Sequence, residues 1–232
     1  MTIAIILAGG MGTRLRSVVA DVPKPMAPVN GRPFLEHQMD YWIKHGVTQF
    51  IISVGYMKEV IMDHFGVSYR NTPLTYALEE QPLGTGGGLL LAAKGLSEPF
   101  LVLNGDTFFE VDLNKLRTFH AEKSSEWTFS LFKANESNRY MGMDVSHSGE
   151  IVSLESTKAN LGHLANGGVY LINPTALGKL GFALGHKLSL EDDLLSAFLK
   201  QGGKLFGIQF NGAFIDIGVP QDYYRASEVL SH

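Results

Sequence analysis

Two aspartates, Asp106 and Asp216, stand where a carboxylate could hold a divalent cation. Asp106 comes shortly after the apolar run 101–103, and Asp216 lies between two isoleucines. Carboxylate oxygens are ligands that Mg²⁺ prefers, often beside phosphates. A carboxylate with apolar neighbours is costly to ionise unless a cation or hydrogen bonds compensate. The pattern favours a cation site at Asp216 more sharply than at Asp106, because an aspartate before a polar turn is common.

A glycine-rich loop, residues 8–15, directly follows the apolar segment 2–8. Its glycines are Gly9, Gly10 and Gly12. In open α/β sheets ligands bind beyond the carboxyl ends of strands, and glycines there let backbone N–H groups approach phosphate oxygens. Arg14 adds a guanidinium that can bind a polyphosphate bidentately. Leu15 stands where a dinucleotide fingerprint needs its third glycine, and no Walker lysine follows. The loop alone therefore fits either a phosphate site or an ordinary glycine turn.

Lys24 follows this loop, with Pro23 and Pro25 on either side. The prolines hold it in an extended, stiff segment, so its ammonium can be aimed at a ligand with little loss of entropy. Together the two stretches read G-x-G-T-R-L and then P-K-P-x-x-P-V, which resembles the signature of the sugar-1-phosphate nucleotidyltransferase family. The resemblance implies that Arg14 and Lys24 are the catalytic cations, holding the nucleoside triphosphate and the leaving pyrophosphate. The nucleotide-binding residues that it implies in the first loop are Leu7, Ala8, Gly9, Gly10, Gly12 and Thr13.

A second glycine-rich loop, residues 80–88, lies between segments expected to form a strand and a helix. Gln81 presents both an amide donor and an acceptor, and at Gly86 no side chain shields the backbone amide from a base. The stretch Pro-Leu-Gly-Thr-Gly-Gly is similar to the loop of mannose- and heptose-1-phosphate guanylyltransferases, which implies base recognition by Gln81 and Gly86. A uridylyltransferase that acts on N-acetylmuramate 1-phosphate has a similar loop, so the choice between GTP and UTP stays open.

The resemblance also covers both aspartates. An Asn-Gly-Asp stretch ends at Asp106, and an Asp-Ile-Gly stretch begins at Asp216. Both look like the metal-binding positions of the family, which implies that Asp106 and Asp216 hold Mg²⁺ as the cofactor. The same segment implies that Asn104 and Gly105 face the nucleotide.

The sugar phosphate is expected to contact residues in the second half of the chain. In the family a Glu-Lys pair and a later Asn-x-Gly-x-Tyr run contact the sugar and its phosphate, and Glu155, Asn166 and Gly167 match these positions. Ser156 stands where the family has its lysine. The nearest lysine, Lys158, is therefore the substitute that we expect, without a motif match to support it.

The segments that must position these residues alternate between strand and helix in the first half. Strands are expected at 2–8, 49–54, 74–78 and 100–103, and helices at 33–45, 57–65 and 87–94. This alternation indicates βαβ units, a parallel sheet and right-handed crossovers. From residue 127 strands dominate, at 127–133, 141–146, 151–155, 168–172, 204–210 and 214–218, with helices at 190–200 after the N-cap Ser189 and from Pro220 onwards.

The fold class expected is therefore α/β: a Rossmann-like, mostly parallel sheet flanked by helices, with a smaller antiparallel flap that binds the sugar. No linker or repeat divides the chain, so one domain is expected over 1–232. Its nucleotide-binding part would be about 1–125, and the part with the sugar site and the second metal ligand about 126–232.

Composition excludes several other classes of protein. The net charge of −4 offers no basic footprint for nucleic acid. The absence of cysteine removes disulfides, thiolate metal sites and cysteine nucleophiles, and fits a reducing cytoplasm. The apolar first residues are too few for a signal sequence or a membrane span. The sequence leaves the oligomeric state open, a homo-oligomer included.

The resemblance runs over nearly the whole chain. Among the branches of the family, the sequence is most similar to the D-glycero-D-manno-heptose 1-phosphate guanylyltransferases. It implies attack by the sugar 1-phosphate on the α-phosphorus of GTP, release of pyrophosphate, and a GDP-sugar for surface polysaccharides. Mannose-1-phosphate guanylyltransferase and the muramate uridylyltransferase stay as alternatives. A catalytically silent, nucleotide-sugar-binding regulatory subunit would lack at least one of the four charged residues, and all four are present. A Rossmann-type dehydrogenase would carry the third glycine.

Overall fold

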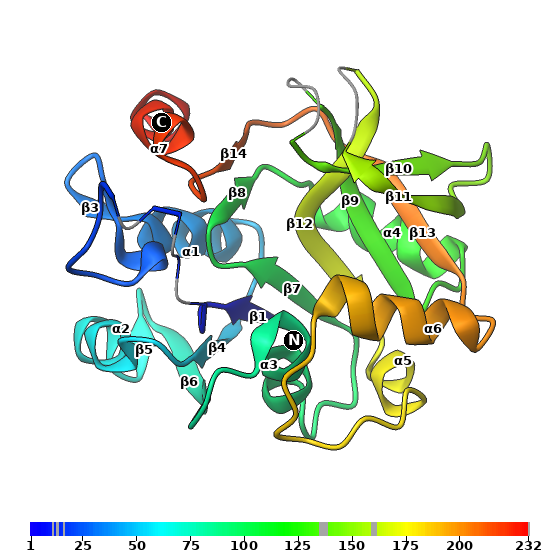
Figure 1. Cartoon of the computed structure of the whole chain (residues 1–232), viewed down its shortest axis with the longest axis horizontal. Helices are drawn as coiled ribbons and strands as arrows, with labels where there is room; N and C mark the ends of the chain where they lie inside the picture. The colour runs from blue at the N-terminus through cyan, green and yellow to red at the C-terminus, as the bar shows by residue number, and fades with distance from the viewer. Residues whose placement is uncertain (11, 13, 16, 135–138, 159–161, 232) are drawn as a thin grey trace.

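The computed structural model describes the chain except residues 11, 13, 16, 135–138, 159–161 and 232, and for 155–158 it describes the backbone alone. Within the described residues the main sheet has ten strands and carries helices on both faces (Figure 1). Its parallel core has the order β7 (Phe100–Asn104), β1 (Ile3–Leu7), β4 (Gln49–Val54) and β6 (Thr72–Leu78). Strands β1, β4 and β7 are apolar runs buried from both sides, as expected for a sheet covered by helices, whereas β6 alternates buried and exposed residues.

Antiparallel strands extend this core on the β7 side. The extension consists of β12 (Leu164–Ile172), β9 (Trp127–Lys133), β10 (Met141–Val145) and β11 (Ile151–Lys158), with β13 (Leu205–Gln209) parallel to β9. The short strand β5 (Ser68–Tyr69) closes the other edge. Two small sheets pair β2 (Pro28–Val29) with β3 (Arg32–Pro33), and β8 (Thr107–Phe109) with β14 (Phe214–Asp216). The expected fold class is confirmed, and the antiparallel part continues the main sheet.

The helices pack on the sheet through separate apolar clusters. On one face lie α1 (Phe34–Lys44), α2 (Lys58–Phe65) and α4 (Leu113–Glu122); on the other lie α3 (Gly84–Ala92), α5 (Pro174–Gly178) and the continuous helix η2 (Leu190–Leu195) to α6 (Ser196–Lys200). Trp42 anchors the first cluster and Trp127 the second, each almost fully buried. Burying a large apolar side chain stabilises by about 1.5–3 kcal/mol. A third cluster fixes α7 (Pro220–Val229) against β14.

Local sequence signals explain most of the helix boundaries. Helix α1 follows Pro33 and stops before Gly46, whose φ of 96° suits glycine. Ser189 caps η2 as predicted, because its side chain accepts a hydrogen bond from Asp192 N. The expected α-helix over 190–200 nevertheless begins with π-helical turns, and α4, which was not predicted, is capped by Asp112. Among the helices of the described residues, none is long and apolar enough to cross a membrane.

Candidate active site

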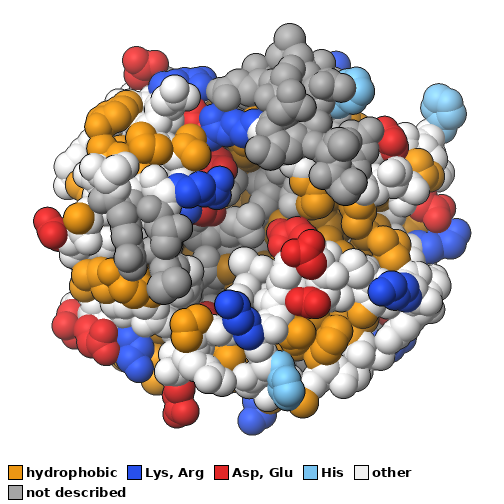
Figure 2. All heavy atoms as spheres, viewed as in Figure 1, with side chains coloured by type: hydrophobic (Ala, Val, Ile, Leu, Met, Phe, Trp, Pro, Cys, Tyr) orange, Lys and Arg blue, Asp and Glu red, His pale blue; other side chains and the backbone are white. Residues whose placement is uncertain are grey.

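The segments that follow β1, β6 and β7 enclose a cavity of about 360 Å³ at one edge of the sheet. Strand β1 pairs in parallel with β4 on one side and with β7 on the other, so the strand order reverses at β1. Open α/β sheets bind ligands in the crevice at the carboxyl ends of the strands at such a point. The cavity is lined by Leu7, Ala8, Gly9, Gly10, Gly12, Pro25, Glu79, Pro82, Gly84, Thr85, Gly88, Asn104, Gly105, Asp106 and Lys187. Figure 2 shows acidic and basic side chains gathered around the middle of one face of the molecule.

Most residues expected to bind the nucleotide lie in this wall. They are Leu7, Ala8, Gly9, Gly10, Gly12, Asn104 and Gly105. Thr13, also expected, lies outside the described residues. The ends of β1 and β7 touch because Gly105 N donates to Leu7 O at 3.1 Å, and a Cβ on Gly105 would lie 2.6 Å from that oxygen. Glycine at position 105 therefore permits the close approach that places Asp106 beside the cavity.

Glu79 forms part of the cavity wall, although sequence reasoning overlooked it. Its side chain is buried, and its two oxygens accept hydrogen bonds from Ser53 Oγ at 2.9 Å and from Leu83 N at 3.0 Å. A Cβ on Gly9 would collide with this carboxylate, so glycine there leaves room for it. Glu79 follows β6 as Asp106 follows β7, and the same strand-end rule could have found it.

Gln81 and Gly86, the residues expected to read the base, do not line the cavity. Gln81 is exposed, and its Nε2 donates to Gly185 O at 3.3 Å. Gly86 N donates to Leu188 O at 2.9 Å, and a Cβ on Gly86 would lie 2.8 Å from the backbone of Ser189. The glycine at this position therefore makes room for a neighbouring backbone.

That neighbouring backbone, residues 186–190, lies along the start of α3. Leu188 bonds through both its N–H and its C=O to the turn 83–87, and Leu190 N donates to Thr85 Oγ1 at 2.9 Å. The docking brings the exposed Lys187 to the cavity wall, opposite in charge to Glu79 and Asp106. No local sequence pattern indicates this contact between distant segments.

Lys24, Asp106 and Asp216 come together from three distant parts of the chain. The extended backbone expected at Lys24 is wrong, because Pro23 is extended but Lys24 begins the short helix η1 (Lys24–Met26); its Nζ donates to Asp106 Oδ2 at 2.7 Å. Pairing of β14 with β8 sets Asp216 opposite Thr107, and Ile217 N donates to Asp106 O at 2.9 Å. The two aspartates therefore lie next to each other, with the Lys24 ammonium held against Asp106; of these three residues Asp106 alone lines the cavity.

This pair of carboxylates fits a divalent cation. Burial raises the pKa of Asp216, and the charge of Asp106 raises it further, whereas Gly218 N at 2.7 Å and Lys24 oppose the shift. A nearby cation would favour the charged form. Mg²⁺ is usually bound by one or two carboxylates together with substrate phosphates. No group of three or more His, Cys, Asp and Glu that could hold a metal exists among the described residues, so water and phosphate oxygens would complete the coordination.

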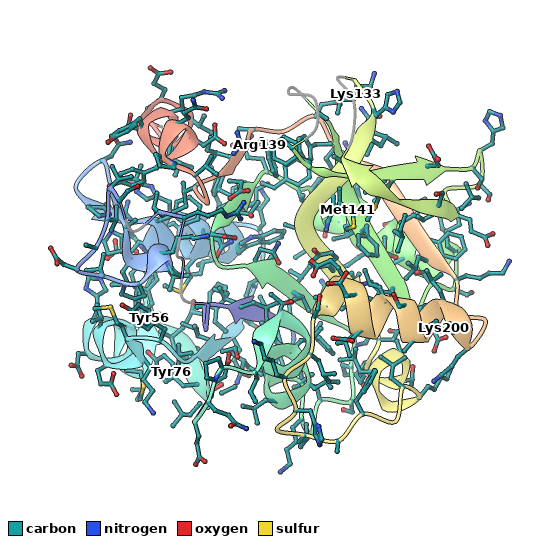
Figure 3. All side chains as sticks on the ribbon, in the orientation of Figure 1. Tyr56, Tyr76, Lys133, Arg139, Met141 and Lys200 are labelled. Atoms are coloured by element: carbon teal, nitrogen blue, oxygen red, sulfur yellow. The ribbon has the colours of Figure 1, made fainter. Side chains whose placement is uncertain are left out.

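Arg139 contacts the backbone of Asp216, whereas Arg14 is exposed and lies outside the cavity wall. Arg14, the expected catalytic cation, is exposed and is not part of the cavity wall. Arg139, which sequence reasoning overlooked, donates from Nη2 to Asp216 O at 3.4 Å and forms an ion pair with the buried Asp222. Figure 3 shows Arg139 between α7 and β10. Only the packing of α7 beside the start of β10 brings this guanidinium there, so no motif marks it.

The residues expected on the sugar side lie on β12 and β11. Asn166 Nδ2 donates to Tyr170 Oη at 2.8 Å, and burial raises the pKa of Tyr170. Gly167 is packed so closely that a Cβ would lie 2.8 Å from the Ser130 carbonyl oxygen. Glu155 and Lys158 lie on β11, and their side chains are outside the described part of the chain.

Comparison with known families agrees with this geometry. The family model described as nucleotidyl transferase matches residues 3–232. The chain belongs to the nucleotidyl transferase family. The enzyme class expected from the glycine loop and the Pro-Lys-Pro segment, a sugar-1-phosphate nucleotidyltransferase, is confirmed.

Two relatives of this nucleotidyl transferase are named D-glycero-alpha-D-manno-heptose 1-phosphate guanylyltransferase. The one from Campylobacter jejuni is 40% identical over 222 residues, which covers 96% of this chain and 97% of the relative. The one from Aneurinibacillus thermoaerophilus is 38% identical over 231 residues, which covers 99% and 98%.

A crystal structure of HddC from Yersinia pseudotuberculosis has the same fold as this nucleotidyl transferase. The TM-score is 0.85 at 33% identity, and the match covers 98% of this chain and 99% of HddC. HddC complexed with GMP-PN gives a TM-score of 0.84. The similarity therefore extends over the cavity and over strands β11 and β12.

Proposed function

We propose that this nucleotidyl transferase transfers a guanylyl group from GTP to D-glycero-α-D-manno-heptose 1-phosphate and releases pyrophosphate. The observation that carries the proposal is the meeting of Lys24 and Asp216 with Asp106, which lines a glycine-walled cavity. Nucleotidyl transfer depends on positioning and on neutralisation of phosphate charge more than on a protein nucleophile. The cavity supplies backbone amides, an ammonium and a pair of carboxylates for these tasks.

Asp106 and Asp216 are the residues that would hold Mg²⁺. When bound there, the ion would neutralise charge on the phosphate oxygens of the two substrates. Backbone N–H groups of the loop 9–12 would bind the triphosphate, because no Cβ at Gly9, Gly10 or Gly12 stands in the way. Lys24 Nζ, already 2.7 Å from Asp106, would stabilise the negative charge that grows on the departing pyrophosphate.

The reaction forms one P–O bond and breaks another. An oxygen of the sugar phosphate attacks the α-phosphorus of GTP and forms a new P–O bond. The bond between the α-phosphorus and the bridging oxygen of the β-phosphate breaks, and its electron pair leaves with pyrophosphate. The product is a GDP-sugar, and the protein forms no covalent bond to either substrate.

Glu79 supports guanine as the base. Each of its oxygens keeps a free lone pair after the bonds from Ser53 and Leu83, so the carboxylate can accept two more hydrogen bonds. Guanine offers N1–H and N2–H donors side by side and matches a carboxylate well. Uracil offers a single N–H between two carbonyl oxygens, which a carboxylate repels. Gln81 and Gly86 would act on the base only indirectly, by positioning the loop 80–88, which directly follows Glu79.

The sugar assignment is supported by the relatives named for heptose 1-phosphate, which this chain matches over nearly their whole length. Asn166 and Gly167, beside Tyr170 on β12, would contact the sugar 1-phosphate together with Glu155 and Lys158 on β11. We assign nucleotide binding mainly to residues 1–125, and sugar binding with the second carboxylate to 126–232.

The test is pyrophosphate release with Mg²⁺ across four nucleoside triphosphates and a panel of sugar 1-phosphates. The panel contains D-glycero-α-D-manno-heptose, mannose, glucose and N-acetylmuramate 1-phosphates. Turnover strongest with GTP and the heptose supports the proposal. Preference for mannose with GTP, or for N-acetylmuramate with UTP, would replace the substrate assignment within the same family.

A further inference from the structure

Glu191 is a half-buried carboxylate that the proposed mechanism leaves unused. It lies in the first turn of η2, where Ser189 Oγ donates a long hydrogen bond of 3.5 Å to its carboxylate and a backbone N–H within the same turn also donates to it. Among the described side chains no lysine, arginine or histidine forms an ion pair with it. A carboxylate removed from water without a cation or good donors is costly, so this one is expected to meet donors that arrive with a ligand.

The position of Glu191 is fixed by the docked segment described above. Ser189 caps η2, and Leu190 N donates to Thr85 Oγ1 at 2.9 Å, so the residue that follows is held against the start of α3. Glu191 also lies in the π-helical part of this helix, and π-turns inside longer helices are frequent at functional sites. Figure 2 shows acidic side chains over this end of the η2–α6 helix, near the middle of the face.

Glu191 lies within electrostatic range of both strand β12 and Asp106. Its charge interacts with Tyr170, whose hydroxyl accepts from Asn166 Nδ2 at 2.8 Å, and with Asp106. It does not belong to the wall of the cavity that contains the glycine loop and Glu79. Burial raises the pKa of Glu191 and the neighbouring acidic groups Asp192 and Asp106 raise it further, whereas the hydrogen bonds from Ser189 and from a backbone N–H oppose the shift.

We propose that the Glu191 carboxylate accepts hydrogen bonds from ring hydroxyls of the sugar 1-phosphate and thereby determines which sugar is accepted. The proposal rests on the proposed function, because it assumes a sugar 1-phosphate in this half of the site. A phosphate group would be repelled by a carboxylate, so the neutral polyol part of the substrate is the complementary partner. Hydroxyls on adjacent ring carbons can both reach one carboxylate, whose two oxygens accept up to four bonds.

The experiment compares wild type, Glu191→Gln and the matched control Asp192→Asn, an exposed carboxylate one position further on. KM is measured separately for GTP and for the sugar 1-phosphate that turns over fastest in the wild type. A hydrogen bond to a charged group corresponds to about a 10- to 100-fold change in affinity. Glu191→Gln should raise KM for the sugar 1-phosphate by about that factor and leave KM for GTP within about twofold. Asp192→Asn should change neither.

Deoxy analogues of the same sugar 1-phosphate provide a second readout that a merely structural role would not move. Wild type should lose about 10- to 100-fold in kcat/KM when the hydroxyl facing Glu191 is removed. Glu191→Gln should distinguish the parent sugar from that analogue far less. If Glu191→Gln does not fold, equal turnover of the wild type with every deoxy analogue overturns the proposal, and a selective loss supports it.

The outcomes separate this proposal from the assignment of the substrate. A sugar other than the heptose as best substrate changes the assignment but leaves the Glu191 comparison intact. Equal KM increases for GTP and sugar, or an effect removed by excess Mg²⁺, would overturn the Glu191 proposal while the transferase activity stands. If no sugar 1-phosphate turns over, calorimetric titration of the panel into wild type decides. Binding weakened by Glu191→Gln supports the contact, and no binding overturns both.

Discussion

Replacing Glu79 with glutamine should shift nucleotide preference away from GTP. In the wild type one carboxylate oxygen accepts from Ser53 Oγ and the other from Leu83 N. The amide oxygen of glutamine must face Leu83, because that N–H has no other acceptor among the residues that the structure describes. Its NH₂ then faces Ser53, whose hydroxyl can turn to accept. The variant should therefore fold, and it should present a donor where guanine also presents donors.

The magnitude follows from the bonds that are lost. A hydrogen bond to a charged acceptor contributes about 1.5–3 kcal/mol, and each 1.4 kcal/mol is a factor of ten. Losing one such bond to guanine should lower kcat/KM for GTP by about 10- to 100-fold. The new NH₂ can donate to a uracil carbonyl, so kcat/KM for UTP should stay level or rise. The ratio of GTP to UTP use should thus fall by at least about tenfold.

The assay is pyrophosphate release with GTP and UTP at a fixed, saturating concentration of sugar 1-phosphate. Glu80→Gln is the matched control, because Glu80 is exposed, lies outside the cavity wall and carries the same charge. A folded Glu79→Gln protein with the wild-type GTP to UTP ratio would refute the assignment of Glu79 to the base. The same ratio change in Glu80→Gln would trace the effect to overall charge.

Three further outcomes are expected. Asp216→Asn should lower turnover by roughly 100-fold or more while keeping the melting temperature or raising it, because burial and a like charge raise the pKa of Asp216 and disfavour its ionised form. Pyrophosphate assays and thermal melts check this, and full activity would contradict it. Gly105→Ala should destabilise by about 1–3 kcal/mol, whereas Gly10→Ala, with no atom within 4 Å of its Cβ, should be near neutral in urea unfolding. Burial lowers the pKa of His120 below 6.5, so the unfolded chain takes up a proton that the folded chain resists. Stability should therefore fall as pH drops from about 6.5 towards the lowered pKa, and His120→Asn should flatten that slope in urea titrations.

Residues at the carboxyl ends of strands could be predicted, because open α/β sheets bind their ligands beyond those ends. Asp106 and the glycine loop follow buried apolar strands, and the ends of parallel strands share one edge of the sheet. Asp216 could be predicted because its isoleucine neighbours make an ionised carboxylate costly. The order of strand and helix in the first half was likewise predictable, because parallel strands covered by helices are apolar throughout.

Contacts between distant segments could not be predicted in this way. The role expected for Gly86 depends on what faces it, and the backbone of Leu188 faces it. The sequence pattern would place Glu191 on the solvated face of an amphipathic helix. The π-turn that positions Glu191 cannot be detected from a hydrophobic period of 3.6 residues. Arg139 and Asp222 meet only when α7 has packed. Each of these depends on tertiary packing, which local spacing does not encode.

The docking of residues 186–190 along the start of α3 has a practical consequence for redesign of the enzyme. Gly84, Gly86 and Gly87 each lie where a Cβ would meet the backbone of that segment. A mutant library that varies them would mostly sample misfolded protein. Thr85 accepts the hydrogen bond from Leu190 N and must be kept as well, whereas Lys187 reaches the cavity from the same junction, and a library limited to Lys187 and Glu79 would vary the wall itself. The junction thus divides the loop into positions that engineering can explore and positions that it must keep.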